Sequence, residues 1–182
     1  MKSRAILSDV PSASAVNAQL PNANFYDCYG ISVPDTNHSA LAYFLKAMGN
    51  SPAWTNSLMI LRNKVVRLFG LKDLGAFGAL NLSKHVSEYA PGDRVGIFTL
   101  ISNSPHEVLL GDSDKHLDVV LSVFIQSPTN DGYVTISVTT VVHVHNFLGR
   151  IYMFLVKPLH KLIAPAVISR ISVNPKCAVC EK

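Results

Sequence analysis

Alternating apolar positions in the second half of the chain predict a run of antiparallel β-strands. Apolar residues recur at alternate positions in residues 117–125 and 134–144, and breaks rich in Gly, Pro, Asn and Asp separate these and two earlier β-prone runs. Short breaks of this kind join neighbouring strands in a meander. The pattern therefore predicts four strands, at Arg94–Ile101, Glu107–Gly111, Lys115–Gln126 and Tyr133–His145.

Apolar residues at three- and four-residue spacing predict helices on either side of these strands. Ahead of the helices, the β-prone run Phe25–Val33 predicts a first strand that ends at Pro34. The side chains of residues 35–37 (Asp-Thr-Asn) can cap a following helix. The predicted helices are His38–Met48, Trp54–Phe69 and Phe147–Ile171, and Leu71–Pro91 is predicted to be a long connection with at most one irregular helical turn.

The last predicted helix is the longest hydrophobic region of the chain. Basic residues interrupt it, so it lacks the roughly 20 nearly continuous apolar residues of a membrane span. Pro158 and Pro165 each remove a backbone hydrogen bond and bend the axis. We therefore expect a long, curved and mostly buried helix with one solvent-exposed side. Its basic residues are Arg150, Lys157, His160, Lys161 and Arg170.

The order of these elements predicts an α+β fold, because a strand and two helices precede the four antiparallel strands and a long helix follows them. The helices are expected on one face of the sheet. The chain of 182 residues (19.8 kDa) fits one domain, which we place at 23–173. Residues 1–22 are small and polar without periodicity and are expected to be disordered, and residues 174–182 are expected to form a flexible tail.

Composition and charge narrow the classes of function. Hydrophobic residues make up 48% of the chain and charged residues only 15%, whereas about 25% is usual for charged residues. The net charge of +4 is a mild bias, and no nucleic-acid recognition motif accompanies it. The composition therefore predicts a globular domain with surplus apolar surface and gives no support to nucleic-acid binding.

The two ends of the chain bear on its compartment. Lys2 and Arg4 precede only a short apolar run, too short for the core of a signal peptide, so we expect a cytoplasmic protein without an integral membrane segment. Cys177 and Cys180 form a C-x-x-C sequence inside the predicted tail, without the strand and helix that flank a redox motif. We expect two exposed thiols there.

The side chains of the last predicted hairpin can be assigned to two faces, because they alternate with a period of two. The apolar positions of both strands must share one face. A turn at residues 128–131 then places Leu117 opposite Val142. On the other face, the same register places His116 opposite His143, Asp114 opposite His145 and Asp118 opposite Val141.

This cluster of histidines and carboxylates has two interpretations. Cross-strand neighbours lie about 4.5–5.5 Å apart at Cβ, close enough to share a zinc, iron or manganese ion. Histidine and aspartate also pair by hydrogen bonds on a polar sheet face without any metal. The candidate catalytic residues are His116, Asp118 and His143, and the candidate metal ligands are His116, His143, His145 and Asp114.

Other motifs and polar positions add little. The sequence contains no G-x-G-x-x-G, G-x-x-x-x-G-K-[ST], G-x-S-x-G or H-E-x-x-H motif, so no particular cofactor is indicated. Arg94 could clamp an anion or form a salt bridge at a strand start, and Tyr152 could point its hydroxyl into a pocket or belong to the core. With Thr139 on the polar face of the last strand, these are the candidate ligand contacts.

Several longer motifs resemble one bacterial family. They are YAPGDRVGIF (residues 89–98), EVLLGDSDKHLD (107–118), TTVVHVHNFLGRIY (139–152) and KPLH (157–160). Together they resemble the domain of unknown function 2867 over about residues 24–172. The resemblance implies the helix-grip architecture of the START and Bet v 1 (SRPBCC) superfamily, in which a curved antiparallel sheet wraps a long C-terminal helix and encloses a cavity.

Three functions follow as hypotheses. A sheet that grips an apolar helix would bind a small apolar or lipid-like molecule. An enzyme of the cyclase, isomerase or hydrolase type would use His116, Asp118 or His143 on such a molecule. A peripheral membrane or partner-binding module would use the basic helix Trp54–Phe69. An exposed sheet face or edge strand would also allow a homodimer.

Overall fold

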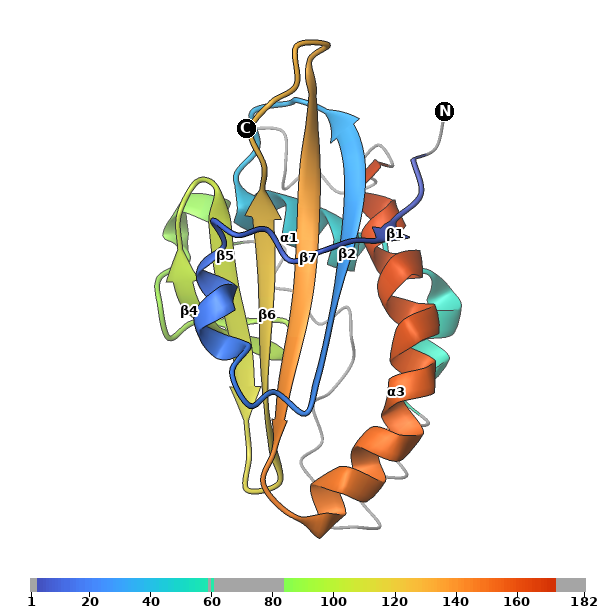
Figure 1. Ribbon diagram of the computed structural model, residues 1–182. Coiled ribbons are helices and arrows are strands. Elements are labelled where there is room, and N and C mark those ends of the chain that lie inside the picture. The colour runs from blue at the N-terminus through green and yellow to red at the C-terminus, as the bar shows by residue number, and fades with distance from the viewer. Residues whose placement is uncertain (1–2, 59, 61–83, 173–182) are drawn as a thin grey trace.

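The computed structural model describes residues 3–58, 60 and 84–172. Within these residues, seven strands form one curved antiparallel sheet in the order β1-β2-β7-β6-β5-β4-β3 (Figure 1). The expected α+β class is confirmed. The strands are β1 (Ile6–Leu7), β2 (Phe25–Pro34), β3 (Arg94–Val95), β4 (Phe98–Asn103), β5 (Glu107–Ser113), β6 (Leu117–Ile125) and β7 (Tyr133–Val144).

Strands β3 to β7 form the predicted meander, since each pairs with the next one along the chain. The first predicted strand is also confirmed, and β2 pairs with β7 along its whole length. One turn lies later than expected. The Asp114 carboxylate accepts hydrogen bonds from the backbone N–H groups of His116 and Leu117, so β5 extends to Ser113 and the turn follows it.

The register of the last hairpin differs from the prediction by two residues. Leu117 pairs with Val144 rather than Val142, and Asp118 pairs with His143. The loop is centred later because the Thr129 N–H donates to the Tyr133 carbonyl and Gly132 takes a left-handed φ of 77° inside it. A shift of two residues keeps every side chain on its predicted face.

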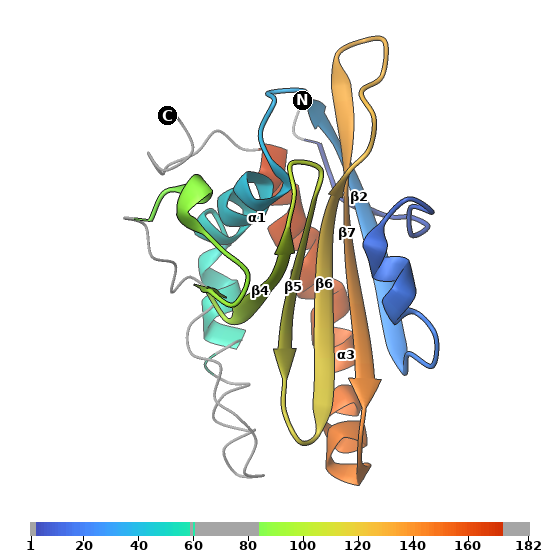
Figure 2. The same ribbon diagram turned by 90° about the vertical axis from the view of Figure 1, so that its left-hand side faces the viewer.

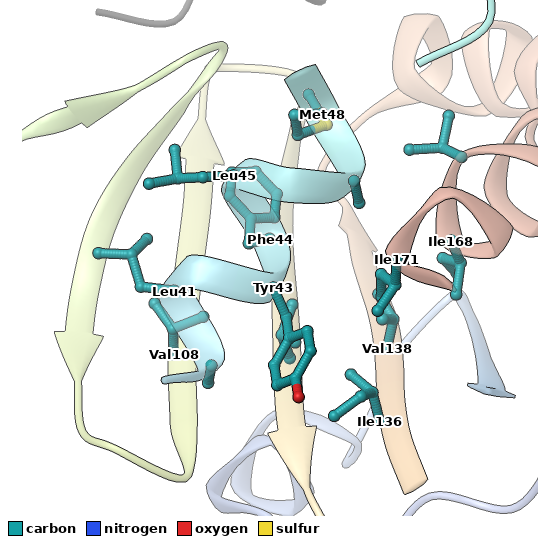
Figure 3. Close-up of a cluster of buried hydrophobic side chains, with 14 of the residues drawn as sticks. Leu41, Tyr43, Phe44, Leu45, Met48, Val108, Ile136, Val138, Ile168 and Ile171 are labelled. Carbon is teal, nitrogen blue, oxygen red and sulfur yellow. The ribbon is translucent and has the colours of Figure 1, made fainter. Parts of the chain in front are cut away.

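The helices form a second layer on one side of the sheet. Helix α1 (Ala40–Gly49) begins two residues later than predicted, because the Ser39 side chain caps it, whereas Asp35 bonds to Asn37 in the preceding turn. Its apolar residues pack on the sheet beside the end of α3 (Phe147–Ile168) and η3 (Ser169–Ser172), as Figure 3 shows. We call the sheet face toward α1 and α3 the inner face and the opposite one the outer face.

The N-terminal segment covers the outer face, which corrects the expectation of disorder for residues 3–22. Figure 2 shows it, in blue, on the side of the sheet opposite α1. Strand β1 pairs with β2, and the short helix η1 (Ala15–Gln19) buries Val16 completely. Composition indicated disorder because these residues are small and polar, but their hydrogen-bonding groups find partners on the sheet.

Helix α3 is far more exposed than predicted. Only Gly149, Val167 and Ile168 are buried, because the helix runs along the β2 side and rests on the sheet along one side only (Figure 1). By length and composition, Phe147–Ser172 could also span a membrane, contrary to our expectation. The core helices of soluble proteins pass the same test, so this finding is weak evidence. Gly149 lets α3 begin against the sheet, since a Cβ there would lie 2.4 Å from the His116 carbonyl oxygen.

Some predicted segments lie partly or wholly outside the described residues. Residues 53–58 and 60 are helical, in agreement with the start of the predicted helix Trp54–Phe69, whose remainder is not described. Of the predicted connection Leu71–Pro91, the described part contains the short helix η2 (Val86–Glu88). The predicted tail at 174–182, with Cys177 and Cys180, falls outside as well.

Candidate functional site

A cavity of about 210 Å³ lies between the inner face of the sheet, α1 and α3. Well-packed interiors contain few voids larger than a water molecule, whose share of liquid volume is about 30 Å³. The space is therefore large enough for a small organic molecule. Its wall is almost entirely apolar: β6 and β7 supply Val119, Leu121, Val123, Val138 and Val142, and α3 supplies residues that include Tyr152, Val156, Leu159, Ile163 and Val167.

Three polar side chains meet at one place in this apolar surrounding. Asp27 on β2 and Thr140 on β7 are direct partners across the sheet and both point to the inner face. His160 on α3 reaches across to them, and its Nε2 lies 3.1 Å from Asp27 Oδ1. His160 and Thr140 line the cavity, whereas Asp27 lies behind His160 and is almost wholly buried.

The carboxylate of Asp27 is only partly satisfied. Its Oδ2 is buried without a hydrogen-bond partner among the described residues. The pKa of Tyr29, two residues along the same face, is raised first by burial and then by the negative charge of Asp27. A buried carboxylate with one partner is costly, so this pair is an unusual feature for an apolar core.

An aromatic ring and a cation flank the pair. The Phe25 ring lines the cavity and meets the His160 ring edge-on, with centroids 5.6 Å apart. The Lys157 ammonium lies 5.3 Å from the centre of the same ring. Phe25 therefore contacts both His160 and Lys157.

Of the three candidate ligand contacts, only Tyr152 lines the cavity. Arg94 lies exposed at the far edge of the sheet, where its guanidinium donates to the Ile97 carbonyl at 2.8 Å and pairs with Asp112 at 3.4 Å. Thr139 is buried but points to the outer face, one position away from Thr140. Arg94 thus forms a salt bridge near the start of β3.

The histidine and aspartate cluster lies at the end of the hairpin and does not line the cavity. His145 Nε2 pairs with Asp118 Oδ2 at 2.9 Å, and His143 Nε2 lies 3.3 Å from the Pro21 carbonyl oxygen. The buried His116 ring contacts the Asn146 side chain through Nδ1, while its Nε2 has no partner among the described residues. The cluster is therefore divided among separate partners.

These side chains do not converge on one point. The Asp114 carboxylate is taken up by two backbone N–H groups of its own turn, and Asp118 accepts from Ser113 in addition to His145. Within residues 3–58, 60 and 84–172, no group of three His, Cys, Asp or Glu side chains is placed to hold a metal ion. The arrangement matches the interpretation of hydrogen-bonded pairs.

Sequence reasoning missed Asp27 and His160 as site residues. Asp27 interrupts an otherwise apolar inward series on β2 that includes Phe25, Tyr29 and Ile31. A carboxylate at an inward position of a buried strand is a signal that could have been used. The partner could not have been found in the same way, because 133 residues separate His160 from Asp27 in the chain.

The fold and the cavity define an α+β protein in which a curved antiparallel sheet and a C-terminal helix border an apolar cavity. The family described as Protein of unknown function (DUF2867) matches residues 19–167. The match covers most of the chain, so this protein belongs to that family, as its motifs suggested. No curated protein and no solved structure matches the chain.

Proposed function

We propose that this protein binds a small apolar molecule in the cavity between the sheet and α3, and that the sheet and helix form a helix grip. The observation that carries the proposal is an unfilled space of about 210 Å³ with an almost wholly apolar wall. A dry apolar cavity of about 150 Å³ takes up a molecule of the size of benzene. A small ring or a chain of similar bulk therefore fits here.

The catalytic residues expected from the sequence lie away from the cavity. His116, Asp118 and His143 are the candidate acids and bases, and none of them lines the cavity. A catalytic group must lie within hydrogen-bond reach of the reacting atoms. A molecule in the cavity would be out of their reach.

The test uses two adjacent residues of α3. Ile163 lines the cavity and Leu162 is 63% exposed, so Ile163→Trp fills the space while Leu162→Trp leaves it open. We expect the neutral fluorescent probe N-phenyl-1-naphthylamine to bind the unaltered protein and Leu162→Trp alike. Ile163→Trp should lose binding while keeping its circular dichroism spectrum. Equal binding by both variants would contradict the proposal.

A second candidate function is peripheral binding to an anionic membrane through the exposed side of α3. Large apolar side chains are exposed there: Phe154 by 80%, Phe147 by 74% and Leu162 by 63%. The exposed residues Arg150, Lys157 and Lys161 accompany them, and the helix contains no acidic residue. An apolar stripe beside basic residues is typical of helices that lie in the interface of an anionic bilayer.

Vesicle flotation tests this second function. The protein should float with vesicles of phosphatidylcholine and phosphatidylglycerol and remain below with phosphatidylcholine alone. Phe154→Asp/Leu162→Asp should abolish flotation, whereas Leu7→Asp, at a 71% exposed position on β1, should not. Unchanged flotation of the double variant would argue against membrane binding. A stable dimer in which Phe154 is covered, with its mass measured by light scattering, would argue against it as well.

A further inference from the structure

His160 and Thr140 form a polar spot on the cavity wall, and Asp27 lies behind His160. These residues come from β2, β7 and α3, so three elements far apart in sequence supply it. Ligand sites are mostly apolar with a few convergent polar groups that orient the bound molecule. The spot has this character, and the question is which chemical group fits it.

Hydrogen-bond accounting defines what the spot offers. The Oδ1 atom of an ionised Asp27 can only accept, and His160 Nε2 then carries the proton between them. In the neutral imidazole, Nδ1 is then an acceptor, and no described residue donates to it. The Thr140 hydroxyl likewise has no hydrogen-bond partner among the described residues. The cavity wall therefore presents one acceptor and one hydroxyl without partners.

The charge at this spot selects among polar groups. A ligand carboxylate in the cavity would be repelled by the negative charge of Asp27, which lies behind the His160 ring. Asp27 Oδ1 is only 3.1 Å from His160 Nε2. A hydrocarbon would leave both His160 Nδ1 and Thr140 Oγ1 without partners, which disfavours its binding. A hydroxyl group donates to Nδ1 and accepts from the threonine hydroxyl, so it satisfies both.

We propose that Asp27, Thr140 and His160 form a polar subsite that selects small apolar alcohols. Asp27 is a positioning residue that fixes the tautomer and orientation of His160. His160 accepts the hydrogen bond of the ligand hydroxyl, and Thr140 donates to its oxygen. This inference rests on the proposed binding function and names the class of ligand.

Displacement of N-phenyl-1-naphthylamine by 1-octanol, octane and octanoate tests the proposal. The measured quantity is the ratio of the octane to the octanol dissociation constant. Thr140→Val, which replaces only the hydroxyl, should lower this ratio by about five-fold, the effect of one hydrogen bond. Thr139→Val, one position away on the outer face, is the matched control and should leave the ratio unchanged.

A second variant removes both members of the Asp27–His160 pair, because replacing His160 alone would leave the buried charge of Asp27 unpaired. Asp27→Leu/His160→Leu removes the whole pair, which buried cores often tolerate, and should lower the same ratio by about ten-fold. A ratio unaffected by both variants, or octanoate as the tightest ligand, would overturn the alcohol subsite alone. If the probe itself does not bind to the unaltered protein, the binding function fails as well.

Discussion

On the outer face of the sheet, the Glu107 carboxylate accepts hydrogen bonds from Ser14, Ala15 and Ser122. On the inner face, the Asp27 carboxylate accepts from His160 alone, and one of its oxygens has no partner among the described residues. Both carboxylates belong to the same sheet, Asp27 on β2 and Glu107 on β5, with β7 and β6 between these strands. The partner of the inner carboxylate, His160, borders the cavity between the sheet and α3.

This difference in hydrogen-bond partners distinguishes a polar cluster that stabilises the fold from one that could bind a ligand. The outer carboxylate uses its hydrogen bonds to hold the N-terminal segment, so its acceptors are taken up by the protein itself. The inner pair leaves His160 Nδ1 available at the cavity wall. A polar group that the fold leaves unsatisfied in an apolar cavity points to where a ligand would bind.

The largest expected effect comes from splitting the inner pair. His160→Ala leaves the buried Asp27 carboxylate without its partner and should lower the free energy of unfolding by about 3 kcal/mol. Asp27→Leu/His160→Leu should restore it to within about 1 kcal/mol of the unaltered protein. Urea denaturation measures both. Equal losses in the single and double variants would show that packing, and not the lone charge, sets the cost.

A smaller effect is expected on the outer face. Glu107→Ala removes the acceptor for the Ser14 and Ser122 hydroxyls and should cost about 2 kcal/mol. Because Glu107 also holds η1, amide hydrogen exchange at residues 15–19 should rise more than at α1. Uniform protection in both segments would mean that the N-terminal segment is held by Val16 and its neighbours alone.

The charge of Asp27 can be followed through a neighbouring group. The pKa of Tyr29 lies above its ordinary value of 10.0, because of burial and then of Asp27. A group with a raised folded-state pKa stabilises the fold fully below its unfolded pKa and loses this contribution as the pH rises through the folded value. Tyr29→Phe should therefore flatten the loss of stability above about pH 10.

Ultraviolet absorbance titration of the tyrosines, compared with denaturation at several alkaline pH values, measures this effect. Asp27→Asn should lower the Tyr29 pKa only in part, since burial is the larger cause. An unchanged Tyr29 titration in Asp27→Asn would show that the Asp27 side chain carries no negative charge in the fold.

The smallest effect is expected at the end of the hairpin. His145 and Asp118 form a pair whose side chains are 42% and 38% exposed, so solvent screens their attraction. His145→Gln should change the free energy of unfolding by less than about 1 kcal/mol and leave probe binding unaltered. A large loss of binding in this variant would reopen the hypothesis of a functional histidine cluster.

The strands and their faces follow from local pattern. The period-two alternation in β6 and β7 assigned Val119, Leu121 and Val138 to the inner face, where they line the cavity. The register was two residues off, because the loop geometry around Gly132 depends on a left-handed φ that the sequence indicates only loosely. The assignment of side chains to the two faces was still right, because the register shift was an even number of residues.

The exposed position of α3 and the order of residues 3–22 could not be predicted in this way. An apolar helix is expected to be buried, yet how much of it is covered depends on what packs against it. Residues 3–22 have the composition of a disordered segment, and they are ordered by contacts such as Ser14 to Glu107, which lies 93 residues away. Both outcomes depend on long-range contacts.

The sequence by itself determined the α+β class, the meander, the apolar face of the sheet and membership of the family, because these depend on local periodicity and on motifs. Only the tertiary structure decided which polar side chains meet. Histidines close in sequence went to different partners, while Asp27 and His160, 133 residues apart, were brought to 3.1 Å. The reason is that α3 is placed by packing against the sheet, which no local pattern encodes.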